Sequence, residues 1–387
     1  MTTLTRREMI RRSGVAALSV WAMARLPASA LGLAEPGADE ELVPFLDPQP
    51  TPVGRPMVKW DEATDWVTPT EKVFDVSHYG KPKVDLANWK LEVNGLVDKP
   101  TSLTLEQIRA RPRKEIVATL ECSGNGSNPS FMGAIGNVRW TGTPLAALLK
   151  ECGVKPEALE VAFYGADTGK ETVRKQEVEQ HFARTLPVRE ADCDDILLCY
   201  EMNGRPLSPG HGAPLRLVVP GWYGIAWVKW LQQIEARERR LMTRFIAKDY
   251  VTLRGEEKEG KIVWTETSVG PMNVKSIVAR VTRKKGDAAG PLRVGGVAWT
   301  QGRVKAVELK IDDGPWVAAR LDESHKEPHT WTFWSYDWKD AKPGEHTLVS
   351  RAIDERGRVQ PSADDPEIKL KKTYWEAYAQ VPRRVKI

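Results

Sequence analysis

Residues 116–126 read IVATLECSGNG, an apolar and β-branched run followed by a glycine-rich segment. The run predicts a buried strand that ends at Glu121, and residues 123–126 predict a tight turn whose backbone can approach a ligand closely. Cys122 stands between the two, so the strand would present one thiol on the turn. A thiolate there suits a soft or high-valent metal, although an isolated cysteine after a strand is more often a small buried apolar residue.

The sequence around this strand predicts an α+β domain over residues 69–265. Short apolar runs that favour strands alternate there with amphipathic segments that favour helices. The strands are expected at 89–93, 115–120 and 215–219, and the helices at 105–110 and 144–152.

A second domain of a different class is predicted over residues 270–387. The boundary is the segment TETSVGPMN at 265–273, after which helix signals almost disappear. Within 307–311 apolar and charged residues alternate, and Asp-Asp-Gly at 312–314 then turns the chain toward Trp316, which predicts a strand and a hairpin. Further strands are expected at 274–280, 292–299, 330–338 and 346–353, and this spacing indicates an immunoglobulin-type β-sandwich.

The N-terminus has the features of a twin-arginine export signal. Residues 5–12 read TRREMIRR, a weakly apolar stretch covers about 14–24, and Pro-Ala-Ser-Ala at 27–30 fits a cleavage site after Ala30. The apolar stretch is shorter than the roughly 20 residues that span a bilayer, so no stable membrane span is expected. Export would place the chain in the periplasm, and residues 31–68 are predicted to form an extended arm on the first domain.

The charge and the cysteine spacing limit the ligands and partners that this chain is expected to bind. Removal of residues 1–30, which hold five arginines and one glutamate, would lower the formal charge from +5 to +1, and no nucleic-acid partner is implied. Cys122, Cys152, Cys193 and Cys199 form no CxxC pair and no CxxCH haem attachment motif, so no haem is expected in this chain. Their disulfide status is left open.

A series of ordered segments carries a family resemblance. In order and spacing, these segments resemble the sulfite oxidase family of molybdenum-cofactor enzymes, and the resemblance covers roughly residues 60–387. The segments are CSGNG at 122–126, NVRWTG at 137–142, FYGAD at 163–167, YEMNGRPL at 200–207, HGAPLR at 211–216, VVPG at 218–221, WVKW at 227–230 and KDY at 248–250.

The resemblance implies a cofactor, its ligands and an active-site pair. Molybdenum would be held by a pyranopterin dithiolene and by the thiolate of Cys122. Tyr250 would lie beside the reacting oxygen, and Asp249 would orient its surroundings. The positions that carry over as cofactor-binding are Phe74, Asp75, Val76, Ser77, His78, Asp167, His211, Arg216, Trp227, Val228 and Lys229.

Plain structural roles stand beside these assignments. His211 could cap backbone in a turn, Lys229 could be a surface charge, and an isolated tyrosine such as Tyr250 is more often part of a core. Arg, Lys and His nevertheless suit a phosphate-bearing cofactor.

The family's activity is the expected function: oxidation of sulfite to sulfate, with electrons passed to a soluble c-type cytochrome by a homodimer joined through the second domain. Two cationic positions of the vertebrate-type enzymes are occupied here by Val76 and Gly126, and Arg139 or another basic side chain would have to replace them.

Three alternatives stay open. A sulfane dehydrogenase subunit of a thiosulfate-oxidising system would act on carrier-bound sulfur. A methionine sulfoxide reductase of the same superfamily is disfavoured, because those enzymes lack the β-sandwich. A non-catalytic exported binding protein would contain no molybdenum.

Overall fold

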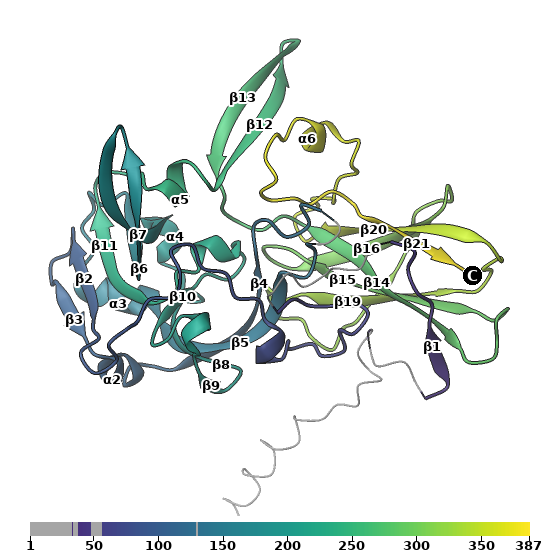
Figure 1. Cartoon of the computed structure of the whole chain (residues 1–387), viewed down its shortest axis with the longest axis horizontal. Coiled ribbons are helices and arrows are strands. Elements are labelled where there is room, and N and C mark those ends of the chain that lie inside the picture. Colours follow the sequence, from purple (N-terminus) through teal and green to yellow (C-terminus); the bar gives the residue numbers. More distant parts are fainter. Residues whose placement is uncertain (1–32, 34–37, 48–55, 129–130) are drawn as a thin grey trace, which may run out of the picture.

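The computed structural model describes residues 33, 38–47, 56–128 and 131–387, which form two β-rich domains lying side by side (Figure 1). The predicted export signal, residues 1–30, lies outside the described residues. Within the described ranges, no helix has both the length and the hydropathy needed to cross a membrane.

The first domain is built on two five-stranded sheets. One has the order β10-β8-β5-β4, with β9 paired to β8, and the other has the order β3-β2-β11-β6-β7, in which the β2–β11 pair is parallel. The strands are β2 (Leu91–Gly95), β3 (Thr101–Leu103), β4 (Lys114–Glu121), β5 (Ile135–Pro144), β6 (Glu160–Val173), β7 (Gln176–Pro187), β8 (Leu197–Met202), β9 (Arg205–Pro206), β10 (Arg216–Val218) and β11 (Leu231–Arg237).

The helices of the described residues are short, between four and eight residues long. Thr104 starts the first with a capping box, in which it accepts a hydrogen bond from the Gln107 N–H and the Gln107 side chain accepts one in return. The helices are α2 (Leu105–Arg109), α3 (Leu145–Cys152), α4 (Val188–Ala191), α5 (Arg244–Ala247) and α6 (Pro366–Lys369), with 3-10 turns at Thr70–Lys72, Pro209–His211 and Gly224–Ala226. The predicted α+β class is confirmed.

The second domain is a two-sheet sandwich, as predicted. Its sheets have the orders β1-β14-β15-β19-β18 and β17-β16-β20-β21, and alternate residues such as Val294 and Leu309 fill the core between them. The predicted hairpin joins β16 to β17. The strands are β14 (Lys275–Lys284), β15 (Leu292–Trp299), β16 (Val304–Ile311), β17 (Val317–Ala318), β18 (Arg320–Leu321), β19 (Thr332–Trp338), β20 (Glu345–Asp354) and β21 (Pro382–Lys386).

The arm before the first domain differs from the expectation. Residues 40–42 form β1 (Glu40–Leu42), which pairs with β14 at the edge of the second domain, so the prediction that the arm lies on the first domain was wrong for this part. The sheet edge of β14 offers unpaired backbone groups, which an extended segment satisfies. Further along, Trp60 stacks on Trp299, so the arm also fills the junction between the domains.

Two long hairpins were not predicted. Strands β6 and β7 pair with each other, and β12 (Val251–Lys258) pairs with β13 (Lys261–Ser268) in a separate hairpin that projects away from the body of the molecule at the top of Figure 1. Every residue of β13 is exposed, and charged residues dominate the tip. Such a strand lacks the apolar alternation on which strand prediction depends.

Candidate functional site

The turn after β4 presents Cys122 to a pocket of the first domain. The Cys122 N–H donates to the Ala134 carbonyl at 2.9 Å, and the Asn125 N–H donates back to the Cys122 carbonyl at 2.9 Å, which closes the predicted turn. Gly126 ends it with φ +88°, a conformation that side chains disfavour. Cys122 and Ser123 of this turn both line the pocket.

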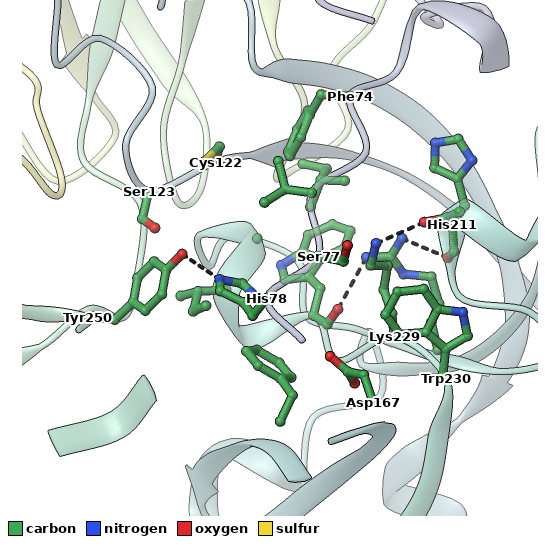
Figure 2. Close-up of a pocket in the computed structure, with 18 residues that line it drawn as sticks. Phe74, Ser77, His78, Cys122, Ser123, Asp167, His211, Lys229, Trp230 and Tyr250 are labelled. Carbon is green, nitrogen blue, oxygen red and sulfur yellow. Dashed lines mark hydrogen bonds between the residues drawn. The ribbon is translucent and has the colours of Figure 1, made fainter. Parts of the chain in front are cut away.

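One end of the pocket holds Tyr250 beside Cys122 (Figure 2). The Tyr250 hydroxyl lies 2.6 Å from Nε2 of His78, whose ring stacks on Phe182 at 4.8 Å. Burial raises the pKa of Tyr250, and the nearby charge of Cys122 adds to that rise. The phenol therefore stays protonated at neutral pH, within hydrogen-bond distance of the His78 ring.

The other end is lined by cationic and polar side chains. Arg216, at the start of β10, is 3 % exposed and donates to the carbonyls of His211 at 3.1 Å and Trp227 at 3.2 Å. Its guanidinium also lies over the Trp140 ring at 4.9 Å. His211 has its Nδ1 2.8 Å from the Ser208 hydroxyl, and burial lowers its pKa, so the imidazole is neutral at pH 7.

Lys229 and Asp167 complete this end. The Lys229 ammonium donates to Asp75 and to the Gly210 carbonyl, both at 2.8 Å, while burial lowers its pKa to about 8. Burial raises the pKa of Asp167, on β6, to about 6. Gly212, with φ +99°, lets the backbone pass Lys229, because a Cβ there would meet the Lys229 Cβ at 2.9 Å.

Several polar atoms in the walls of this pocket are buried without a hydrogen-bond partner among the described residues. Buried polar groups are almost always paired, so a group of unpaired atoms in one cavity indicates a polar ligand. The atoms are Oγ of Ser123, Oδ1 of Asp167, Nε2 of His211 and Nε of Arg216.

The pocket brings together most of the predicted site residues. Those that line it are Phe74, Val76, Ser77, His78, Cys122, Asp167, His211, Arg216, Trp227, Lys229 and Tyr250. Three others do not line it. Asp75 reaches it through Lys229, Val228 is fully buried behind the wall, and Asp249 pairs with Arg244 at 2.7 Å.

Arg139 does not supply the charge that is absent at Val76 and Gly126. Its guanidinium pairs with Glu115 at 2.8 Å on an exposed surface and does not line the pocket.

Two family models match the chain, one for each domain. The oxidoreductase molybdopterin binding domain matches residues 78–245, and the Mo-co oxidoreductase dimerisation domain matches residues 266–379. The sulfite oxidase of Gallus gallus is 30 % identical over 329 residues, which cover 79 % of this chain and 70 % of that protein. The chain belongs to the sulfite oxidase family of molybdopterin enzymes.

The curated relatives of this chain are longer than the chain by different amounts. The mitochondrial sulfite oxidase of Drosophila melanogaster is 28 % identical, with 84 % of this chain and 60 % of that protein covered. The NADH nitrate reductase of Solanum lycopersicum is 30 % identical, with 76 % and 36 % covered. The chain thus spans between about a third and 70 % of the length of these curated relatives.

A solved structure matches this family member over nearly its full length. The sulfane dehydrogenase SoxCD of Paracoccus pantotrophus superposes with a TM-score of 0.72 at 28 % identity, covering 90 % of this chain and 88 % of that one. The match spans both domains.

The residues present fit a molybdenum–molybdopterin cofactor. A phosphate-bearing tail requires charge-assisted donors, which Arg216 and Lys229 provide, and a pterin edge requires partners such as the unpaired atoms of Asp167 and His211. Cys122 lies at the opposite end, where a thiolate can reach the metal. This division is visible in Figure 2.

Sequence reasoning missed an aromatic pair from the C-terminal segment. Trp375 stacks on Tyr250 with ring centroids 4.1 Å apart, and Tyr374, which is 57 % exposed, lies 3.9 Å from Trp375. A Cβ on Gly124 of the cysteine turn would lie 3.5 Å from Tyr374. The two rings thus extend from the catalytic end of the pocket to the surface, and no local signal distinguished them from the other tryptophans and tyrosines.

A buried arginine behind Tyr250 was missed as well. Arg184 lies on β7 and is 3 % exposed, and it donates to the Val269 carbonyl at 2.7 Å and to the Phe245 carbonyl. No carboxylate pairs with it in the described part of the chain. Its charge acts on Tyr250 and opposes the rise in the tyrosine pKa. The alternation of Phe182 and Arg184 on one strand face was the only available signal.

Proposed function

We propose that this protein is a periplasmic molybdenum-dependent dehydrogenase that oxidises sulfite to sulfate and passes the electrons to a separate c-type cytochrome. The observation that carries the proposal is the shared pocket, in which Cys122 and the Tyr250–His78 pair stand opposite donors for an anionic cofactor. The names of the chicken and fly relatives support sulfite as the substrate.

The balance of the reaction defines what the protein must do. Sulfite and water give sulfate, two protons and two electrons, and two one-electron acceptors take the electrons in turn. Bound molybdopterin would supply the two-electron oxygen transfer. The protein must attract an anion and hold or release a proton beside it.

The described residues support these tasks. Tyr250 and His78 can hold or release a proton at the phenol oxygen. The guanidinium of Arg184, which no carboxylate among the described residues neutralises, provides positive charge behind Tyr250. It would replace the two arginines of the vertebrate-type enzymes whose positions are occupied here by Val76 and Gly126.

The location and assembly are part of the same proposal. The twin-arginine pattern in residues 1–30 supports export of the folded, cofactor-loaded chain to the periplasm. The match to a dimerisation domain over residues 266–379 supports a homodimer joined through the sandwich.

The test uses protein exported through its own signal. Molybdenum near one per chain, with sulfite-dependent reduction of both ferricyanide and cytochrome c, is the expected result. Fully loaded protein that fails to reduce ferricyanide with sulfite would contradict the proposal, and protein without molybdenum would favour a non-catalytic binding role.

One alternative substrate has its own support. No lysine or arginine among the described residues lines the Cys122 end of the pocket, and the sulfane dehydrogenase matches over 88 % of its length. These observations favour sulfane sulfur bound to a carrier protein. Loaded enzyme that oxidises a persulfidated carrier and leaves sulfite unchanged would establish this second candidate.

A further inference from the structure

The residue before the cysteine is a fully buried glutamate whose two oxygens are both hydrogen-bonded. Glu121 ends β4 with no exposed surface. Its Oε1 accepts from the Lys275 ammonium at 2.6 Å and from the Asn125 amide at 3.0 Å, and its Oε2 accepts from the Trp299 indole at 2.9 Å. A carboxylate with this many donors is held in one orientation.

Two of the three donors come from the other domain. Lys275 is the first residue of β14 and Trp299 is the last of β15, and the two are direct partners in the strand register. A single pair of facing residues in the sandwich sheet therefore contacts Glu121. In Figure 1, β4 runs along the border where these strands approach the first domain.

The same contacts extend to the cysteine turn itself. The Lys275 ammonium also donates to the Asn125 carbonyl at 3.2 Å, and the Asn125 side-chain oxygen accepts from the Ala134 N–H at 3.1 Å. Cys122 donates from its own N–H to the Ala134 carbonyl. The backbone on both sides of Cys122 is thus fixed to Lys275 through Glu121 and Asn125.

We infer that Lys275 and Trp299 of the second domain are positioning residues for the metal-binding cysteine, acting through the carboxylate of Glu121 and the turn at Asn125. The inference rests on the proposed role of Cys122 as the metal ligand. It gives the second domain a role inside its own subunit, in addition to the dimer contact.

The charge arrangement explains why the contact has to be complete. Lys275 is 5 % exposed, so neither it nor Glu121 can be compensated by water if its partner is removed. A carboxylate without its ammonium partner, one residue from Cys122, would shift its position, and the turn would move with it. Neutralising both members together removes this imbalance and keeps much of the volume.

The experiment compares Lys275→Met with Glu121→Gln/Lys275→Met and with Arg383→Met. Arg383 is a matched control, because it is another buried cation of the sandwich that pairs with a carboxylate, Asp47 at 3.4 Å, away from the cysteine turn. Molybdenum per chain, the electron paramagnetic resonance spectrum of the bound metal and thermal unfolding are measured on each purified protein.

Lys275→Met is expected to lower metal loading about tenfold and to shift the resonance spectrum, as loss of an outer partner of a ligand does. The double variant is expected to recover loading, and Arg383→Met to change unfolding alone. Equal loading and an unchanged spectrum in Lys275→Met and Arg383→Met would overturn the inference.

Two further variants keep the result interpretable. If Lys275→Met does not fold, Trp299→Phe retains the packing and removes the indole donor, and a wild-type spectrum in that variant would overturn the inference. Cys122→Ser separates the two claims. If it leaves loading and spectrum unchanged, the ligand assignment fails, whereas a change in Cys122→Ser without one in Lys275→Met rejects only the role of the second domain.

Discussion

The two ends of the pocket differ in how their polar groups are hydrogen-bonded. At the Cys122 end Tyr250 is paired with His78 and aromatic rings pack around them, and only the Ser123 hydroxyl, among the described polar atoms there, is buried without a partner. At the other end Asp167, His211 and Arg216 keep buried atoms without protein partners. The difference indicates that the first end is preorganised before any ligand arrives, while the second is completed only by a ligand.

Cys122→Ser is expected to produce the largest effect. The hydroxyl is a poor replacement for a soft thiolate ligand, so turnover should fall by more than about 100-fold, beyond the loss caused by an outer partner. Sulfite-dependent ferricyanide reduction measures this, and circular dichroism checks that the fold persists. Cys193→Ser, at an exposed thiol, is the control. Near-normal turnover in Cys122→Ser would show that Cys122 is not the metal ligand.

Tyr250→Phe tests the preorganised end alone. Removing the hydroxyl breaks the contact with His78 and keeps the stacking on Trp375, so kcat should fall about 100-fold while metal content stays the same. Steady-state kinetics with metal analysis measure the two quantities. Tyr374→Phe is the matched control, since this exposed phenol lies beyond Trp375. Identical kinetics with and without the Tyr250 hydroxyl would refute its role.

At the end of the pocket that holds Asp167, burial of this carboxyl should make the free energy of unfolding of the cofactor-free protein depend on pH. Burial raises the pKa of Asp167 to about 6, so folding is most favourable when this carboxyl is protonated. Its contribution is present at low pH and is lost as pH rises from about 4 to about 6. Wild-type protein should lose about 2 kcal/mol relative to Asp167→Asn between pH 4 and pH 7, measured by urea unfolding. A constant difference between the two proteins would contradict the assignment.

The sequence was informative where side-chain chemistry follows chain order. The strand before Cys122, the α+β to sandwich boundary and most pocket residues could be predicted, because each depends on local pattern or on a motif. The partners that come from distant segments could not. Trp375 reaches Tyr250 from the C-terminal segment, and Lys275 reaches Glu121 across the domain border. Such contacts depend on tertiary packing, which leaves no periodic signal.

Asp249 shows the limit of carrying a residue over by its motif. The sequence places it beside Tyr250, but both residues lie in the turn between α5 and β12, where adjacent side chains need not point to the same place. In the structure Asp249 pairs with Arg244 outside the pocket, and its predicted catalytic role stays a prediction.

Lys229→Met should give the smallest of these effects, and it separates binding of the cofactor by Lys229 from its contact with Asp75. Lys229 and Lys81 pair with different oxygens of the same carboxylate, Asp75, but the Lys229 side chain is 13 % exposed and that of Lys81 is 55 % exposed. If the buried amine also binds the anionic cofactor, its loss should weaken cofactor retention about tenfold, the value of one charge-assisted hydrogen bond. Lys81→Met should leave retention unchanged, because its pair is exposed to solvent. Dialysis followed by molybdenum analysis measures both. Equal retention in the two variants would mean that Lys229 serves only to hold Asp75, and that the unpaired atoms of Arg216 and His211 carry the anion-binding end by themselves.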